Sequence, residues 1–151
     1  MFIKFISGWG NYKTIKSKIY KPSNIDQLKK IIKKNKKYTI RGMGRSYGDS
    51  SIGKNIICLE RFEKVVKLDV KKGLIHCSSN STINQILKKT VNKGWFFKVT
   101  PGSKFISIGG LIASDVHGKN HHVDGTFCDY LVEIEILLPS GKIVKINKKK
   151  K

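Results

Sequence analysis

Apolar residues recur at helical spacing in two segments of the chain. The first segment follows Pro22 and is predicted to run as a helix to about Lys34, with Ser23 marking its start. The second follows Ser81, which can cap a helix, and ends at Gly94. The apolar faces consist of Ile25, Leu28, Ile31 and Ile32 in the first helix and Ile83, Ile86, Leu87 and Val91 in the second.

Short apolar runs, several with strict alternation, predict strands around these helices. Alternation is clearest on both sides of Lys71–Gly73, where it predicts a hairpin, and from Tyr130 to Leu138, before a second turn. The predicted strands are 38–41, 56–59, 65–70, 74–78, 95–99, 130–138 and 142–146, with an extended stretch after Tyr12. The chain therefore combines helices with strands, and its middle is rich in sheet.

A glycine-rich loop directly follows the strand predicted at 38–41. Its glycines allow positive φ and bring backbone N–H groups close to a ligand, while Arg41 and Arg45 offer charge and Ser46 and Tyr47 offer hydroxyls. These properties suit an anionic diphosphate. The glycine spacing matches neither a Walker loop nor the dinucleotide fingerprint, so a structural glycine turn explains the loop equally well.

A second glycine-rich region follows the strand predicted at 95–99. Pro101–Gly102 and Gly109–Gly110 permit close approach to a flat ligand, with tight helix–sheet packing as the alternative. The polar segment Asp115–His122 adds three histidines, which with Cys128 could suggest a metal site. Glycine and asparagine interrupt the helical spacing there, so we expect no metal and a ligand-lining, hydrogen-bonding role instead.

The chain is strongly basic. Lys and Arg number 31 against 10 Asp and Glu among 151 residues, a formal charge of +21 that raises the possibility of a polyanion partner. Nearly all of this charge is Lys, which is poorer than Arg at bidentate recognition of phosphate or bases. We therefore expect no specific nucleic-acid binding and interpret residues 148–151 as a Lys tail, with a Lys-rich polyanion-binding module kept as the alternative function.

Several classes of protein are excluded or disfavoured by simple patterns. No run approaches the roughly 18 apolar residues of a transmembrane segment, and the N-terminus lacks the apolar stretch of a secretory signal. A cytoplasmic location is therefore expected. The three cysteines, Cys58, Cys77 and Cys128, form no paired motif and are interpreted as free, buried thiols.

Taken together, the two glycine-rich segments resemble the FAD-binding domain, of the PCMH type, of the p-cresol methylhydroxylase and vanillyl-alcohol oxidase superfamily. The likeness is strongest to the decaprenylphosphoryl-ribose oxidase branch, and it covers nearly the whole chain. The resemblance implies an α+β fold, with a small parallel β-α-β subdomain followed by a mainly antiparallel sheet subdomain with helices. It further implies that residues 1–147 are the N-terminal part of that domain, incomplete at the C-terminus, with the substrate-binding cap domain absent.

The resemblance also implies which residues contact FAD. The first loop would hold the diphosphate, chiefly through backbone N–H groups, and the second region would line the flavin and ribityl chain. Carried onto this sequence, the diphosphate residues are Arg41, Gly42, Met43, Gly44, Arg45, Ser46 and Tyr47. The remaining contacts are Pro101, Gly102, Ser103, Ser107, Gly109, Gly110, Ala113, His117, Gly118, Asn120 and His121.

One position departs from the wider superfamily. Many relatives carry a histidine, covalently tethered to the flavin, directly after the second glycine of the first loop, whereas this chain has Arg45. Because arginine cannot form that tether, FAD is expected to be bound non-covalently.

The resemblance implies an FAD-linked oxidoreductase that oxidises a sugar or polyol hydroxyl by hydride transfer to flavin N5. The substrate can be lipid-linked, and a reductase acting on the product is an implied partner. No catalytic base is assigned, because the relatives carry it in the C-terminal part that this chain lacks. A non-functional truncated product is the third hypothesis.

Overall fold

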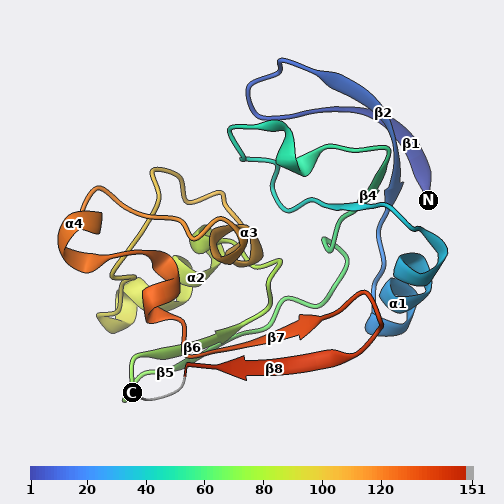
Figure 1. Ribbon diagram of the computed structural model, residues 1–151. Helices are drawn as coiled ribbons and strands as arrows, with labels where there is room; N and C mark the ends of the chain where they lie inside the picture. Colours follow the sequence, from blue (N-terminus) through green and yellow to red (C-terminus); the bar gives the residue numbers. More distant parts are fainter. Residues whose placement is uncertain (149–151) are drawn as a thin grey trace. The chain divides into compact units, whose positions relative to one another are not determined.

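The structure is a computed structural model that describes residues 1–148 (Figure 1). These residues divide into two compact units. The first consists of residues 1–63 with 135–145, and the second of residues 64–134 with the chain from Ile146 onward. The predicted Lys tail lies outside the described residues, apart from its first residue.

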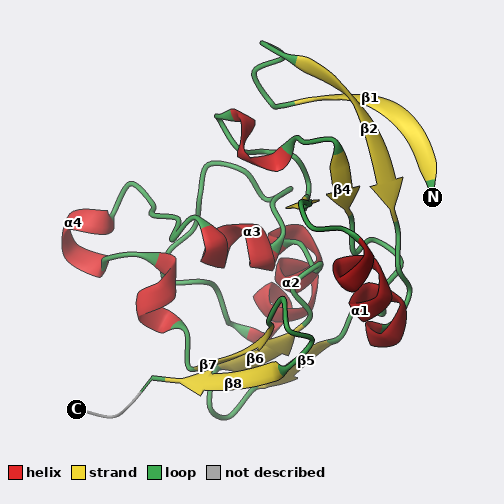
Figure 2. Cartoon of the chain, turned by 45° about the vertical axis from the view of Figure 1, so that its right-hand side comes forward, coloured by secondary structure: helices red, strands yellow, loops and turns green. Residues whose placement is uncertain are grey.

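Both units contain helices and strands (Figure 2). The first unit contains β1 (Phe2–Ser7), β2 (Thr14–Tyr20), α1 (Ile25–Lys34), β3 (Thr39–Ile40), the 3-10 helix η1 (Asp49–Ser51) and β4 (Asn55–Ile57). The second contains β5 (Val66–Asp69), β6 (Leu74–Cys77), α2 (Ile83–Thr90), η2 (Val91–Lys93), α3 (Ile108–Ala113), α4 (His121–Asp124) and η3 (Phe127–Tyr130). A last pair of strands, β7 (Glu133–Leu137) and β8 (Ile143–Asn147), follows.

The first unit is built on a four-stranded sheet in the order β1-β2-β4-β3. Strand β1 is antiparallel to β2, whereas β2, β4 and β3 run parallel, so that α1 connects two parallel strands. This arrangement confirms the predicted β-α-β subdomain. Ile19, Ile56 and Ile57 form the buried centre of the sheet, and α1 contributes Leu28 to the core. Such burial removes each apolar side chain from water and contributes most of the stability.

The second unit combines an antiparallel hairpin with helices. Strands β5 and β6 pair antiparallel, and Ile83 and Ile86 of α2 pack with Ile108 and Leu111 of α3 in one core cluster. The β7–β8 pair is also antiparallel, since the N–H of Leu138 donates to Lys142 O (2.9 Å) and that of Lys148 to Val132 O (3.1 Å). The predicted antiparallel part of the fold is thereby confirmed. No helix within residues 1–148 is long and apolar enough to cross a membrane.

Both predicted helix starts are displaced by one residue. Asn24, not Ser23, caps α1 by accepting a hydrogen bond from the N–H of Gln27 (3.0 Å). Thr82, not Ser81, caps α2 in a reciprocal capping box with Gln85. Ser81 is instead fully buried. Adjacent polar residues can all serve as caps, so spacing alone does not select between them.

The strand predicted at 95–99 is wrong. The segment is irregular, and its large side chains pack against different parts of the unit. Trp95 packs against Gly73 and donates its indole N–H to Val70 O (3.0 Å). Phe97 joins the helical core, where its ring centroid lies 5.7 Å from that of Phe127. In contrast, β1 is a full strand that the sequence analysis left unassigned.

Candidate functional site

The first glycine-rich loop, residues 41–48, connects β3 to η1 and is anchored at both ends. The N–H of Arg41 continues the sheet by donating to Ile57 O (3.0 Å), and the N–H of Ile52 donates to Asp49 O (3.2 Å). Between these anchors, the N–H groups of residues 42–48 donate no hydrogen bond to any residue of the described chain. Because backbone N–H groups are strong obligatory donors, this loop offers seven successive amides to an anion or to water.

Arg41 holds the loop in place. Its Nη1 donates to Ser51 O (3.1 Å) and Ser51 Oγ (3.2 Å), and its Nη2 donates to Ser7 O (3.1 Å). The sequence predicts that this arginine offers charge to a ligand. The structure shows its guanidinium linking the end of β1 to η1, which adds a positioning role; direct contact with diphosphate stays a prediction.

Gly44 is required for a reason that the sequence did not reveal. Its φ of +65° favours glycine, and a Cβ atom at this position would lie 2.2 Å from Nη2 and 2.6 Å from Cζ of Arg41. The space beside Gly44 is thus filled by the Arg41 side chain. The glycine permits the arginine clamp, in addition to any approach of a ligand.

Arg45 lies over an aromatic ring from the β1–β2 turn. Its Cζ is 4.0 Å from the centroid of Trp9, a cation–π arrangement, and its Nε is buried without a hydrogen-bond partner within residues 1–148. The turn packs closely on the loop, since a Cβ at Gly8 would lie 3.5 Å from Gly48 O. Trp9 is therefore part of the loop's surroundings. An aromatic residue between two glycines was its sequence signal, but nothing in the sequence placed it under Arg45.

The other loop residues vary in exposure. Gly44 is buried, Ser46 is half-buried, and Gly42, Met43 and Tyr47 are exposed. Tyr47 is 94% exposed, so its hydroxyl points away from the packed part of the unit. The Tyr47 hydroxyl is therefore not held by packing in this unit.

In the second unit, the glycine pair at the start of α3 is explained by close packing. The N–H of Gly109 donates to Ser79 O (2.8 Å), and a Cβ at Gly109 would lie 3.1 Å from Ser79 Cβ. Ser107 caps α3 by accepting from the N–H of Gly110 (3.3 Å). The amides at this helix start are therefore used internally, as the packing alternative predicts. Their contact with a cofactor stays a prediction.

The segment after α3 is fixed by a network around Gly118. A Cβ at Gly118 would lie 2.9 Å from Thr100 O, and Gly118 O lies 3.4 Å and 3.1 Å from the Nδ1 atoms of His117 and His121. Asn120 donates to Lys98 O (3.0 Å) and to an Asp124 carboxylate oxygen (2.7 Å). The structure thus brings together four residues that the sequence analysis singled out: His117, Gly118, Asn120 and His121.

An ion pair supports this network. Lys98 Nζ lies 2.9 Å from Asp124 Oδ1, and the hydrogen bond from Lys98 lowers the pKa of the Asp124 carboxyl group. Three further predicted contacts lie in the segment 101–113. Gly102 has open space beside its Cα, Ser103 Oγ accepts from the N–H of Phe105 (3.2 Å), and Ala113 is exposed at the end of α3.

Cys128 and Asp115 form a polar contact rather than a metal site. The N–H of Cys128 donates to Asp115 Oδ1 (3.2 Å), and burial, followed by Asp115, raises the pKa of the Cys128 thiol to about 11. A thiol with so high a pKa is a poor metal ligand or nucleophile. Within residues 1–148, no group of three or more His, Cys, Asp or Glu side chains is placed to hold a metal ion.

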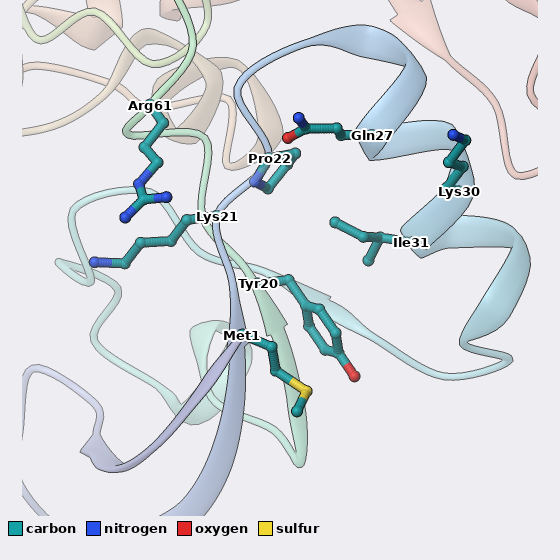
Figure 3. Close-up of a pocket in the computed structure, with 8 residues that line it drawn as sticks. All are labelled: Met1, Tyr20, Lys21, Pro22, Gln27, Lys30, Ile31 and Arg61. Carbon is teal, nitrogen blue, oxygen red and sulfur yellow. The ribbon is translucent and has the colours of Figure 1, made fainter.

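A separate hollow of about 420 Å³ opens in the first unit (Figure 3). Its lining comes from the start of β1, the end of β2, α1 and the segment after β4, and it includes no residue of the loop 41–48. Pro22 and Ile31 give it an apolar side, while Lys21, Lys30 and Arg61 supply charge. The glycine loop is therefore an open surface feature and not part of this hollow.

A glycine-rich loop that follows a parallel strand in a mixed α/β fold is typical of domains that bind a nucleotide cofactor. The family described as "FAD binding domain" matches residues 17–147. The chain belongs to this family of FAD-binding domains, found in FAD-linked oxidoreductases. The resemblance deduced from the two glycine-rich segments is confirmed, and FAD is the cofactor that the family binds.

Relatives agree with this assignment. The chain is 31% identical over 105 residues to decaprenylphosphoryl-beta-D-ribose oxidase of Mycolicibacterium smegmatis, covering 68% of this chain and 23% of that protein. It is 25% identical over 137 residues to a D-lactate dehydrogenase of Archaeoglobus fulgidus, covering 87% of this chain and 31% of the relative. The chain therefore spans between about a quarter and a third of the length of these relatives.

A solved structure supports the fold. Cholesterol oxidase from Brevibacterium sterolicum matches with a TM-score of 0.80 at 12% identity, over 99% of this chain and 33% of that chain. At this identity the match speaks for the fold alone. The predicted α+β, PCMH-type architecture is confirmed.

Proposed function

We propose that this chain binds FAD non-covalently and forms the cofactor-binding part of an oxidoreductase that oxidises a sugar or polyol hydroxyl. The observation that carries the proposal is the loop 42–48, whose amides are not used within the described chain and whose shape Arg41 fixes. Oriented amides of this kind stabilise the negative charge of a diphosphate.

The backbone amides, Gly44 and Arg45 have distinct roles in this proposal. The amides bind the diphosphate oxygens, and Gly44 leaves room for the Arg41 clamp. Arg45 adds positive charge from its place on Trp9, and its buried Nε is a donor to which the loop gives no partner among the described residues. When bound, FAD supplies a hydride acceptor at N5; the protein's part is to hold and orient it.

The non-covalent mode follows from the residue at position 45. A guanidinium is charged at all accessible pH values and is not a nucleophile, so it forms no bond to the flavin ring. Its stacking on Trp9 gives it an electrostatic role instead.

The sugar substrate is supported by the relative at 31% identity, whose name includes a lipid-linked ribose. D-lactate is the rival, because a D-lactate dehydrogenase aligns over more of the chain at 25% identity. These relatives are roughly three to four times as long as the matched segment, so we place the substrate base and the substrate pocket outside these 151 residues.

The test is an absorbance spectrum between about 300 and 550 nm of the purified chain, with and without added FAD, before and after acid precipitation. A flavin spectrum that moves to the supernatant on precipitation supports non-covalent FAD. Flavin that stays in the pellet contradicts the non-covalent mode. A folded chain that takes up no flavin but binds DNA with a steep salt dependence favours the polyanion-binding alternative.

Because the substrate pocket is placed outside these 151 residues, substrate class is tested, without oxygen, on a flavin-loaded protein in which this chain is joined to the part that carries the pocket. Bleaching of the flavin band by a ribose-type sugar supports the sugar assignment. Bleaching by D-lactate and not by the sugar overturns it.

A further inference from the structure

The β1–β2 hairpin has one buried and one exposed face. Ser17 and Ile19 point inward and are 1% and 3% exposed. On the opposite face, Ile3 pairs with Lys18 and Phe5 pairs with Lys16. We call these four residues, Ile3, Phe5, Lys16 and Lys18, the outer face of the hairpin.

Large apolar side chains on this face are open to solvent. Ile3 is 56% exposed and Phe5 is 67% exposed, and Lys16 and Lys18 are exposed beside them. Strand β1 stands at the edge of its sheet. At the tip of the same hairpin, Tyr12 is 93% exposed and Trp9 is 52% exposed. Apolar residues gathered in this way on a protein surface mark an interaction site.

The charge of this segment has one sign. Residues 1–25 contain no Asp or Glu and five lysines: Lys4, Lys13, Lys16, Lys18 and Lys21. Lys21 pairs with Glu60, whereas no ion pair within the described chain involves Lys16 or Lys18. The outer face therefore combines apolar side chains with cations and carries no compensating acid.

We propose that the outer face of the hairpin binds the surface of an anionic lipid bilayer. Lys16 and Lys18 would lie at the headgroup phosphates while Ile3 and Phe5 enter the boundary with the acyl chains. Tyr12 at the tip suits the same interface, where its exposed ring meets both apolar and polar surroundings. The inference is independent of FAD binding, and it would hold the protein where a lipid-linked substrate resides.

A nucleic acid fits this face less well. The cations of the outer face are lysines, not arginines, and the aliphatic Ile3 offers no surface on which a base can stack. Contact with a phosphate backbone would leave Ile3 and Phe5 against a charged, hydrated surface. An anionic lipid bilayer is the partner that suits both the apolar side chains and the lysines of the outer face.

The test is co-sedimentation of the folded chain with vesicles of phosphatidylcholine alone or with about 30% phosphatidylglycerol, in about 100 mM salt. We expect binding only to the anionic vesicles. Lys16→Gln/Lys18→Gln should weaken the partition roughly 30-fold, since each lysine near the surface contributes roughly fivefold. Ile3→Ser/Phe5→Ser should weaken it roughly tenfold with no change in charge.

The matched control is Lys71→Gln/Lys93→Gln, which makes the same change in net charge on exposed residues of the second unit. It should weaken partition by less than about threefold, because these residues lie outside the hairpin. Far-UV circular dichroism verifies that all variants fold. Equal losses in the control and the Lys16/Lys18 variant, equal binding to neutral vesicles, or a dimer that Ile3→Ser/Phe5→Ser dissociates would each overturn the proposal.

Discussion

Replacing Gly44 with alanine tests the arginine clamp at its tightest point. The new Cβ would lie 2.2 Å from Arg41 Nη2, so the guanidinium has to move. Movement breaks at least the Nη2 bond to Ser7 O and disturbs the two Nη1 bonds to Ser51. The substitution also places alanine at a φ of +65°.

The two effects can be separated by magnitude. Alanine at positive φ costs about 1 kcal/mol, and a hydrogen bond from a charged donor is worth about 1.5–3 kcal/mol. Gly44→Ala should therefore lower the free energy of unfolding by about 3 kcal/mol. Gly94→Ala is the control, because Gly94 has a φ of +78° and nothing within 4 Å of its Cβ position, so it should lose only about 1 kcal/mol.

The assay is urea denaturation of the single variants and of both glycine changes in an Arg41→Ala background. Removing the guanidinium relieves the clash, so Gly44→Ala should then cost no more than Gly94→Ala, a coupling of about 2 kcal/mol. If FAD binds only the loop that Arg41 holds in place, the coupling energy of about 2 kcal/mol weakens FAD binding by roughly 30-fold in Gly44→Ala. Equal costs for the two glycines, unchanged by the Arg41 background, would refute the clamp.

Three further outcomes are expected. In a Trp95→Phe variant, FAD should quench the fluorescence of Trp9, because this ring lies beside the loop; unchanged emission on FAD uptake would contradict that placement. Gly73→Ala should destabilise the protein by about 2 kcal/mol more than alanine at an uncrowded glycine, since its Cβ would lie 2.5 Å from the Trp95 ring; urea midpoints measure the difference. In a variant with Cys128 as the sole cysteine, alkylation at pH 8 should be slow, because the pKa of the thiol is about 11. Asp115→Asn should accelerate the alkylation, because it removes a charge that raises this pKa. Equal alkylation rates with Asp115 and with Asn at this position would disprove the coupling.

The sequence predicted those elements whose cause is local. Helix α1 was found because Leu28 and its neighbours recur at helical spacing, and the glycine-rich loop 41–48 because its glycines directly follow a strand. Strand β1 was missed because Lys4 interrupts a short apolar run that alone did not distinguish a strand from an exposed end. The segment 95–99 was misassigned because large apolar residues favour a strand, whereas the Trp95 indole bonds to Val70 O instead.

In the candidate site, too, the local features were predicted from the sequence and the contacts between distant segments were not. Residue types and glycine positions indicated a loop for an anion, and the family confirms an FAD-binding domain. The function of Arg41 could not be read from the sequence, because its partner Ser7 lies 34 residues away. The stacking of Arg45 on Trp9 could not be predicted from the sequence either, because it depends on how the β1–β2 turn folds back. Contacts between distant segments depend on the tertiary structure, so local sequence patterns do not predict them.

The Arg41 clamp also sets a time order for folding during synthesis. It joins Ser7, 34 residues earlier in the chain, to Ser51, 10 residues later. Closing so long a loop loses conformational entropy that local contacts do not restore. The hairpin, α1, β3 and β4 must therefore be in place, and the chain must have left the ribosome through Ile57, before the amides of the loop are fixed, because β3 pairs with β4 and the N–H of Arg41 donates to Ile57 O. A nascent chain stalled before that residue would have no shaped cradle for a dinucleotide, so capture of the cofactor would mark the completion of the four-stranded sheet.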